Sequence, residues 1–380
     1  MTFSLKVDAT KFRSHLVSVM NCYATAGAEF VPVIKGNGYG FGRDVLADEA
    51  FRLGCNRIAI GTVWELGQSL ADFAGEILVL EPFNSSDESA VNQWRQHLEH
   101  NSDRIIVTVS NLDLAAVRSA GAKNIYLEGK TSLSRFGILH FDMQSIANFN
   151  DLKVLGLSLH LPIVQPAIKV DATTEISSAF NGANLSQSMT DVWNWIVLYE
   201  ELSTKFSLPK CISLSHVSDK QVQSFKKMMQ SYNFDLDIEV RIGTKLWLGE
   251  PSALQACGTV LQIHDMTHRQ TVGYQQIDSG NNKRLIVVSG GTAHGVAMAA
   301  PSNASSLRKR GIAIAEGISQ AIGKVRSPFS YNGQNLDFVE PPHMHVSMLW
   351  SNDMTISVGD TLDCNVRNTT SSFDCVTGLD

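Results

Sequence analysis

The alternation of two residue patterns between residue 30 and about residue 245 is the feature that most constrains the fold. Short β-branched runs are separated by longer stretches, such as 63–70, 111–119, 190–206 and 219–232, whose apolar residues recur at helical spacing. Eight strands separated by helices are what a closed parallel barrel requires, whereas an open doubly wound sheet usually has fewer strands. We therefore predict an α/β fold with a (β/α)8 TIM barrel. The runs, about eight in number, are residues 30–35, 57–63, 76–80, 104–109, 124–128, 154–160, 211–215 and 238–242.

The pattern changes after residue 248. Short alternating runs at 256–263, 270–275, 284–289 and 343–350 are broken by Gly, Asn and Pro, which is typical of antiparallel strands. We predict that residues 9–247 form the barrel and that residues 248–380 form a mostly antiparallel β domain. Residues 1–8 are a candidate to pair into this second domain.

Composition limits the classes of function. Hydrophobic residues make up 44% of the 380 residues and charged residues 18%, so the chain can bury a large core. A formal charge of -6 gives no broad basic surface, which argues against nucleic acid or an anionic membrane as a partner. The N-terminus lacks the features of a signal peptide, no apolar run is long enough to span a bilayer, and the six cysteines contain no Cys-x-x-Cys pair. We expect a cytoplasmic protein with reduced thiols.

Polar residues at the predicted strand ends indicate where the chemistry lies. In a barrel of this type the active site is formed at the C-terminal ends of the strands. The polar and close-approach residues at or just after these ends are Lys35, Glu128, Arg135, His160, Ser215, His216, Ser218, Arg241 and Gly243. An aldehyde cofactor that bears a phosphate would use residues of these types.

Lys35 is the candidate to bind an aldehyde. It follows the apolar run 30–34, so its ammonium is expected at the barrel mouth, where desolvation lowers its pKa and frees the amine for a Schiff base. The glycine-rich segment 36–40 lets the backbone approach a ligand closely. A solvated surface charge is the alternative for a lone strand-end lysine, and the glycine-rich segment with its tyrosine favours the site.

Other residues offer contacts to a phosphate and to a ring. Gly243 and Thr244 provide backbone N–H groups and a hydroxyl, and Ser218 stands where the helix 219–232 is expected to begin. An N-cap without a ligand is an equally good interpretation of Ser218. Arg241 on a barrel strand needs a partner, because a lone buried guanidinium is costly, and a ring nitrogen that accepts a hydrogen bond would be one.

Two motifs resemble those of a known family. Residues 33–40, Val-Ile-Lys-Gly-Asn-Gly-Tyr-Gly, resemble the lysine signature of alanine racemases, and residues 240–244, Val-Arg-Ile-Gly-Thr, resemble their strand-eight Arg-Pro-Gly motif. The resemblance covers nearly the whole chain. It implies the fold-type-III arrangement, in which a barrel holds pyridoxal 5'-phosphate and a β domain completes the site of the partner in a head-to-tail homodimer. The implied reaction is racemisation of a small amino acid, alanine by family.

The resemblance also implies roles for individual residues. Lys35 would bind the cofactor covalently and serve as one of two bases. Arg241 would donate a hydrogen bond to the ring nitrogen and keep the cofactor a weak electron sink, which suits racemisation because it suppresses transamination. Arg135 would lie near the cofactor hydroxyl and the substrate carboxylate, and Met348 of the second subunit would meet that carboxylate. The other implied cofactor contacts are Tyr39, Ser218, Gly243 and Thr244 at the phosphate and His160 near the ring.

The sequence departs from the family in one segment and at three further positions. Gly-Thr-Ala-His-Gly at residues 291–295 replaces Gly-Tyr-Ala-Asp-Gly, so Thr292 stands where the second subunit's catalytic tyrosine is expected. An aliphatic hydroxyl is a poor proton carrier at neutral pH. Glu128 replaces a lysine that is often carbamylated, and its carboxylate is suited to hold Arg135. Leu349 replaces an aspartate, and Phe373 replaces a tyrosine that contacts the phosphate.

Two residues are candidates for the missing base. His294 is the nearest replacement, because histidine titrates in the useful range, and a histidine satisfied within a loop is the alternative. Tyr274 is the second candidate. His343 and His345 share a strand face, but such pairs are more often surface residues than ligands, so we expect no metal.

Three functions stay open from the sequence. The first is a pyridoxal-phosphate-dependent racemase in which Lys35 and either Thr292 or His294 are the opposed bases. The second keeps the cofactor but changes the reaction to decarboxylation, aldol cleavage or epimerisation of another amino acid. The third is a non-catalytic protein that binds pyridoxal phosphate. The product distinguishes the first two, and a binding protein would show no turnover.

Overall fold

The computed structural model describes residues 2–144, 149, 151–167, 185–298 and 325–379. The chain divides into two compact units. The barrel unit comprises Ser14–Gly38 and Arg43–Gly249, and the β unit comprises Met1–Arg13, Tyr39–Gly42 and Glu250–Asp380. The short segment Tyr39–Gly42, which directly follows the first glycines of the lysine signature, belongs to the β unit, and no pattern in the sequence indicated this.

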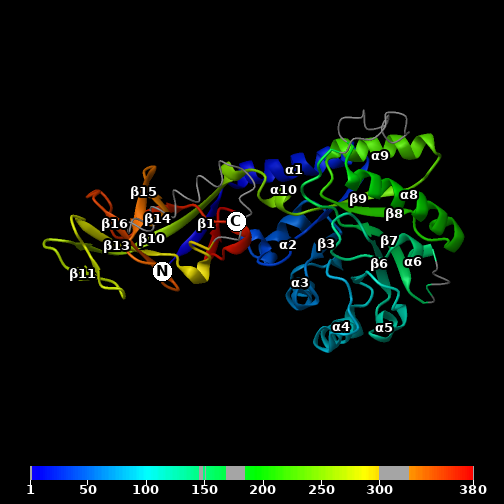
Figure 1. Ribbon diagram of the computed structural model, residues 1–380, viewed down its shortest axis with the longest axis horizontal. Coiled ribbons are helices and arrows are strands. Elements are labelled where there is room, and N and C mark those ends of the chain that lie inside the picture. The colour runs from blue at the N-terminus through cyan, green and yellow to red at the C-terminus, as the bar shows by residue number, and fades with distance from the viewer. Residues whose placement is uncertain (1, 145–148, 150, 168–184, 299–324, 380) are drawn as a thin grey trace. The chain divides into compact units, whose positions relative to one another are not determined.

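The barrel unit contains eight parallel strands in the order β2-β9-β8-β7-β6-β5-β4-β3 (Figure 1). The sheet closes because Val33 bridges to Ala59 and the Ile34 amide donates to the Ala59 carbonyl at 2.8 Å. All eight strands overlap the runs seen in the sequence, so the predicted barrel is confirmed. The strands are β2 (Ala28–Pro32), β3 (Arg57–Ile60), β4 (Glu76–Val79), β5 (Ile105–Val109), β6 (Asn124–Gly129), β7 (Lys153–Leu159), β8 (Cys211–Ser215) and β9 (Asp237–Ile242).

Helices alternate with these strands, and Figure 1 shows α3, α4, α5 and α9 outside the ring of strands. Side chains that accept hydrogen bonds from main-chain N–H groups cap four of them: Asp87 on α4, Asp113 on α5, Ser186 on α8 and Ser218 on α9. The helices are α1 (Ala9–Thr25), α2 (Arg43–Arg52), α3 (Leu66–Asp72), α4 (Glu88–Asn101), α5 (Leu114–Ser119), α6 (His140–Gln144), α8 (Gln187–Phe206), α9 (Asp219–Ser231) and α10 (Thr244–Trp247).

The barrel is filled by side chains. Every residue of β5 is buried, as expected for a parallel strand covered by helices on one side and by other strands' side chains on the other. A cluster from successive strands includes Val31, Ala59, Leu78, Ile106 and Tyr126. Because such a barrel is a packed core, a ligand can be bound only at its ends.

Glu239 of β9 is the centre of a buried polar network in the barrel. Its carboxylate accepts hydrogen bonds from Arg57 Nη1 at 2.6 Å, Tyr126 Oη at 3.2 Å and Ser213 Oγ at 2.5 Å. Arg57 also pairs with Glu76 at 2.7 Å, and that carboxylate is far more exposed, 41% against 2% for Glu239. The network joins strands β3, β6, β8 and β9, so its hydrogen bonds connect different sides of the barrel.

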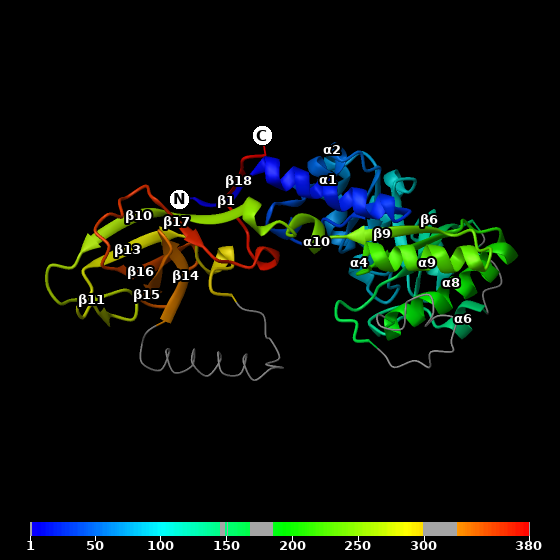
Figure 2. The same ribbon diagram turned by 90° about the horizontal axis from the view of Figure 1, so that it is seen from above.

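The β unit has one eight-stranded sheet in the order β13-β16-β15-β14-β17-β10-β1-β18, and β13 also pairs with β10 (Figure 2). The pairing is antiparallel except between β1 and β18, which confirms the expected mostly antiparallel domain. A separate hairpin pairs β11 with β12. The strands are β1 (Phe3–Val7), β10 (Leu254–Asp265), β11 (Thr271–Val272), β12 (Ile277–Asp278), β13 (Arg284–Ser289), β14 (Val325–Tyr331), β15 (Gln334–Phe338), β16 (Val346–Ser351), β17 (Thr361–Cys364) and β18 (Cys375–Thr377).

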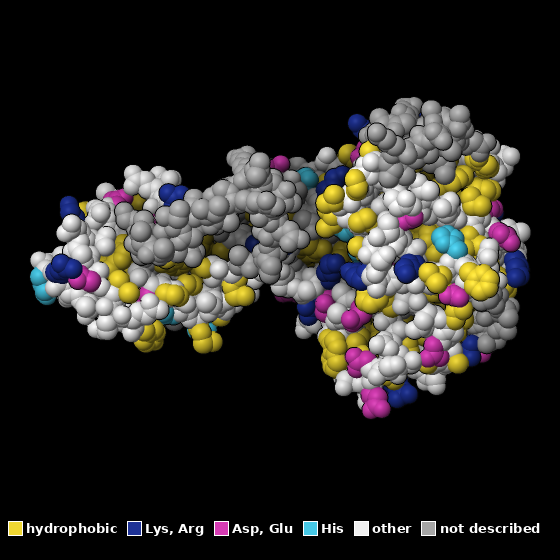
Figure 3. Space-filling model, viewed as in Figure 1, with side chains coloured by type: hydrophobic (Ala, Val, Ile, Leu, Met, Phe, Trp, Pro, Cys, Tyr) yellow, Lys and Arg dark blue, Asp and Glu magenta, His cyan; other side chains and the backbone are white. Residues whose placement is uncertain are grey.

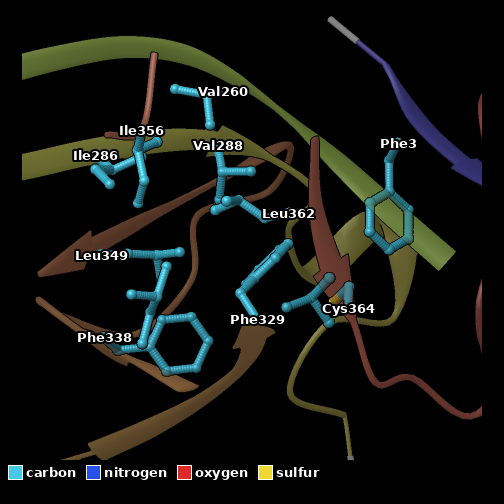
Figure 4. Close-up of a cluster of buried hydrophobic side chains, with 12 residues drawn as sticks. Phe3, Val260, Ile286, Val288, Phe329, Phe338, Leu349, Ile356, Leu362 and Cys364 are labelled. Atoms are coloured by element: carbon cyan, nitrogen blue, oxygen red, sulfur yellow. The ribbon is translucent and has the colours of Figure 1, made fainter. Parts of the chain in front are cut away.

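Phe329 lies centrally in the core of the β unit, between Phe338 and Cys364 (Figure 4). Leu349 from β16 and Phe3 from β1 belong to the same cluster, so the N-terminal strand contributes to the core. Two predicted strands are shorter than expected. The run 270–275 forms a strand only at Thr271–Val272, because the chain turns at Gly273, and the run 343–350 becomes a strand only at Val346.

Acidic and basic side chains are interspersed on the face of the barrel unit seen in Figure 3. Neither charge sign predominates on the described part of that face. In the parts of the chain that the structure describes, no helix combines the length and the apolar character needed to cross a membrane.

We predict that Glu239→Ala lowers the free energy of unfolding by about 3 kcal/mol, because it leaves buried donors of the network without their acceptor. Glu76→Ala is the matched control, since it removes the exposed partner of the same arginine and is expected to cost about 1 kcal/mol or less. Urea unfolding followed by tryptophan fluorescence measures both. Equal losses in the two variants would contradict a structural role for the buried network.

Candidate functional site

Lys35 lies where the barrel closes. The strand β2 ends at Pro32, earlier than expected, so Lys35 follows the strand instead of ending it. The preceding residues are held on both sides: the Val33 amide donates to Ile242 at 2.9 Å, and Trp247 Nε1 donates to the Val33 carbonyl at 2.7 Å. These bonds fix the start of the Lys35 segment at the C-terminal end of the barrel.

The environment of Lys35 favours its neutral amine. The side chain reaches solvent, but partial burial at the barrel mouth lowers its pKa, and the positive charges of Arg135 and Arg241 lower it further. Glu65 opposes this shift. The Glu65 carboxylate accepts a hydrogen bond from the Gly61 amide at 2.9 Å. Gly61 in turn lies next to Lys35, since a Cβ atom added to Gly61 would be 3.2 Å from Lys35 Cβ. Sequence reasoning missed Glu65, which follows a strand end by only a few residues.

Arg241 is buried, and one of its three guanidinium nitrogens has no partner among the described residues. Its Nη1 donates to Ser158 Oγ, and its Nη2 donates to the Leu159 carbonyl at 2.9 Å. Arg241 Nε is buried and has no hydrogen-bond partner among the described residues. A buried donor without a partner is costly, so this atom indicates the place of an acceptor that a ligand would supply.

Glu128 is the buried carboxyl group of the site, only 4% exposed. Burial raises its pKa to about 7, although the charges of Arg241 and Arg135 act in the opposite direction. Its Oε2 atom has no hydrogen-bond partner among the described residues. Near neutral pH the Glu128 carboxyl group is therefore present in both its protonated and its ionised form.

Two histidines face each other at the ends of β7 and β8. The rings of His160 and His216 are perpendicular, with centroids 5.4 Å apart. Burial lowers the pKa of His160 to about 2, with contributions from Arg241 and Arg135, and burial and Lys35 lower the pKa of His216. Both rings are therefore neutral at pH 7. His216 has a left-handed backbone, φ 56°, which is uncommon for a non-glycine residue and often marks a functional position.

Three of the four residues expected at a phosphate, Ser218, Gly243 and Thr244, follow the ends of β8 and β9. Ser218 is the N-cap of α9 and forms a capping box with Gln221, so the N-cap interpretation is observed. Gly243 precedes the short helix α10, and Thr244 is exposed as its first residue. Whether these three residues bind a phosphate stays a prediction.

The remaining predicted site residues lie in the β unit. Tyr39 is buried and has φ 55°, and a Cβ on the neighbouring Gly40 would lie 3.1 Å from the Phe373 ring. Met348 lies in β16 opposite Val287 of β13 and is partly buried. Thr292 is exposed at the start of the short 3-10 helix Thr292–His294.

His294 makes structural contacts. It is 8% exposed, its Nδ1 accepts from the Gly291 amide at 3.2 Å, and its Nε2 lies 3.3 Å from Asp374 Oδ1. Its ring also lies 5.3 Å from that of Phe3. Since Nδ1 is an acceptor, Nε2 carries the proton and donates it to the carboxylate. To move a substrate proton, His294 would have to release one of these partners.

The apolar departures from the family are accommodated by the core. Leu349 is fully buried in the cluster of Figure 4, where an aspartate would lack solvent. Phe373 stacks on Phe3 with centroids 5.2 Å apart.

Tyr274, the second candidate for the missing base, is 85% exposed, and its ring lies 4.5 Å from that of His343.

His343 pairs with Glu340 at 2.7 Å. Among the residues that the structure describes, no group of three or more His, Cys, Asp or Glu side chains is arranged to hold a metal ion.

The barrel mouth suits an aldehyde that carries a phosphate. Lys35 supplies an amine whose pKa is lowered, and Arg241 Nε supplies the unpartnered donor. Lys35, Arg135 and Arg241 also interact electrostatically, and such a group of cations favours an anion. The residues present therefore fit pyridoxal phosphate.

Comparison with known proteins finds a matching family model and solved structures with a similar fold. Residues 7–185 match the family described as "Alanine racemase, N-terminal domain". No curated protein matches the chain. The solved alanine racemase of Clostridium difficile 630 has 13% sequence identity and a TM-score of 0.66, over 96% of this chain and 87% of that chain.

Two further solved structures are similar. The biosynthetic alanine racemase of Pseudomonas aeruginosa has 15% identity and a TM-score of 0.56, over 97% of this chain and 91% of that chain. The alanine racemase of Bartonella henselae, solved with covalently bound pyridoxal phosphate, has 17% identity and a TM-score of 0.58, over 96% of this chain and 90% of that chain. At these identities the structural similarity shows the fold.

The raised pKa of Glu128 predicts a pH dependence of stability in the cofactor-free protein. The folded state keeps a proton that the unfolded chain releases between pH 4.5 and about 7, so the free energy of unfolding falls as the pH rises through this interval. We expect Glu128→Gln to remove this component, which is on the order of 3 kcal/mol. Urea unfolding at several pH values measures it, and parallel curves for the two proteins would contradict the assignment.

Proposed function

Because this chain belongs to the alanine racemase family, we propose that it is an amino-acid racemase that uses pyridoxal 5'-phosphate, with alanine or a related small amino acid as the substrate. The observation that carries the proposal is the pair formed by Lys35, whose pKa is lowered at the barrel mouth, and Arg241, whose buried Nε has no partner among the described residues. An amine and a lone donor are the groups that an aldehyde and a ring nitrogen require.

The cofactor would be held at its aldehyde, its ring and its phosphate. Lys35 would bind its aldehyde, Arg241 Nε would donate to its ring nitrogen, and the neutral His160 would pack at its ring. When bound, pyridoxal phosphate supplies the electron sink that makes the Cα proton of an amino acid acidic. The phosphate would be bound by Tyr39, Ser218, Gly243 and Thr244.

Residues of the protein would then bind the substrate carboxylate and transfer the Cα proton. Arg135 orients the substrate carboxylate, with Met348 of a second subunit on the same group. Lys35 Nζ takes or returns the Cα proton on one face, a role that its lowered pKa favours. Because Arg241 stays charged and donates, it gives the ring nitrogen no proton, and the sink stays weak enough to disfavour transamination.

The second proton carrier is proposed to come from the segment Thr292–His294 of a partner subunit in a head-to-tail homodimer. Thr292 is exposed, and the buried His294 has its tautomer fixed by Gly291 and Asp374. A histidine held by a carboxylate is suited to proton transfer once its second nitrogen is released. We assign the proton transfer to His294 and a supporting role to Thr292.

We predict that Lys35 is the covalent attachment site. Borohydride reduction of the protein with pyridoxal phosphate is expected to leave the cofactor on the peptide that contains Lys35, and Lys35→Ala is expected to show neither this adduct nor Cα–H exchange in deuterium oxide. Lys245→Ala is the control, because Lys245 also lies at the barrel end but contacts Tyr23. An adduct on another lysine would overturn the assignment.

We also predict that two inactive variants restore activity when mixed. Lys35→Ala and His294→Ala each lose racemisation, but a head-to-tail hybrid dimer contains one site with both residues intact, so re-equilibrated mixtures should recover about a quarter of wild-type activity. Chirality of the alanine product measures it, with Thr292→Ala replacing His294→Ala in a parallel mixture. No recovery in either mixture, with all variants folded, would exclude the shared site.

The same assays separate the other reactions. Exchange without inversion, or release of an amine or an aldehyde, would identify another pyridoxal-phosphate reaction. Cofactor attachment without any turnover would identify a binding protein.

A further inference from the structure

The segment that carries Arg135, here called the Arg135 loop (residues 130–138), is fastened to helix α8. The Asp191 carboxylate accepts a hydrogen bond from the Ser132 main-chain N–H at 2.6 Å. The hydroxyls of Ser132 and Ser188 lie 3.2 Å apart. The Trp195 indole N–H donates to the Lys130 carbonyl at 2.8 Å. Three contacts therefore join one loop to one helix.

The three α8 residues share one face of the helix. Ser188, Asp191 and Trp195 stand at positions i, i+3 and i+7, which brings them into line. Ser188 and Trp195 are buried, and a Cβ on Gly129 would lie 2.6 Å from the Trp195 ring. The second oxygen of Asp191 accepts from Gln187 Nε2 at 3.0 Å, so both carboxylate oxygens are engaged.

The base of the Arg135 loop is closed as a hairpin. The Lys130 amide donates to Ile138 at 2.9 Å, and the Ile138 amide donates to Glu128 at 2.8 Å. Gly137 has φ 118°, and a Cβ there would overlap the Lys130 main-chain nitrogen, so the hairpin requires glycine at this position. With its base closed, the loop can shift chiefly by moving relative to α8.

The loop is also tied to the neighbouring strand end. Thr131 Oγ1 donates to the carbonyl of His160 at 2.6 Å and accepts from the Leu133 amide at 3.3 Å. Arg135 itself is exposed, with its guanidinium 5.1 Å from the centre of the Phe136 ring. The position of Arg135 therefore depends on main-chain anchors and not on contacts of its own guanidinium with α8.

We propose that Ser188, Asp191 and Trp195 are positioning residues that hold Arg135 at the barrel mouth, with Asp191 contributing most. This rests on the proposed function in so far as Arg135 binds the substrate carboxylate. Asp191 contributes most because its hydrogen bond to Ser132 is charge-assisted, and such bonds are roughly twice as strong as neutral ones. Because the Arg135 loop is already ordered before the substrate binds, binding does not carry the entropy cost of ordering this loop.

The test compares three variants, each loaded with pyridoxal phosphate. Asp191→Ala removes the acceptor, Asp191→Asn keeps an oxygen that can accept from Ser132, and Asn194→Ala is the control on the exposed side of α8. The first readout is the rate at which trypsin cuts after Arg135, measured by mass spectrometry, because such cleavage follows the population of the opened loop. The second is the KM and kcat for racemisation.

We expect Asp191→Ala to increase cleavage and KM by about tenfold each, with a smaller change in kcat, since one charged hydrogen bond is lost. Asp191→Asn should recover part of both changes, because its amide oxygen accepts the same hydrogen bond without the charge, and Asn194→Ala should match the wild type. Trp195→Phe keeps an aromatic ring but removes the N–H, so it should also accelerate cleavage.

The two readouts separate the inference from the proposed function. Unchanged cleavage in both Asp191→Ala and Trp195→Phe would overturn the positioning role, whatever the activity. Faster cleavage in a protein that racemises no amino acid would support the positioning role and overturn the proposed function. A KM increase that Asp191→Asn does not relieve would assign Asp191 to general stability and would also overturn the inference.

Discussion

The closure of the barrel at β2 and β3 is the constraint on which the site depends. The hydrogen bond from Ile34 to Ala59 joins the first strand of the sheet to the last in its spatial order. The C-terminal ends of eight parallel strands then share one rim, where Lys35, after β2, interacts electrostatically with Glu65, after β3. An open sheet with the same strand order would leave these two residues at opposite edges.

The chemistry of the rim follows from an imbalance of charge. Three cations, Lys35, Arg135 and Arg241, interact there, while the buried Glu128 is partly neutralised by its raised pKa near pH 7. Burial keeps His160 and His216 uncharged. A site of this kind is best satisfied by an anion with an acceptor nitrogen, and its proton equilibria will change when such a ligand binds.

The sequence predicted the barrel well because buried parallel strands are short continuous apolar runs, and all eight runs became strands. It also singled out Lys35, Arg241 and Glu128, since ionisable residues at the ends of such runs are rare, and the structure places all three at the same end of the barrel. Their roles stay predictions. The contacts of α8 were not predictable, because Asp191 and Trp195 look like ordinary residues of an amphipathic helix until the loop they bind is seen. The hydrogen bonds of the two His294 ring nitrogens could likewise not be predicted, because one of the partners, Asp374, is distant in sequence.

The pairing of β1 has a consequence for how the chain is made. Val7 pairs with Leu254, and Leu5 pairs with Val376 near the C-terminus. During synthesis the first strand must therefore wait, unpaired, while the whole barrel unit emerges from the ribosome and has time to fold. The β unit can be completed only when β18 has also been synthesised, because β1 lies between β10 and β18 and needs both to be fully paired.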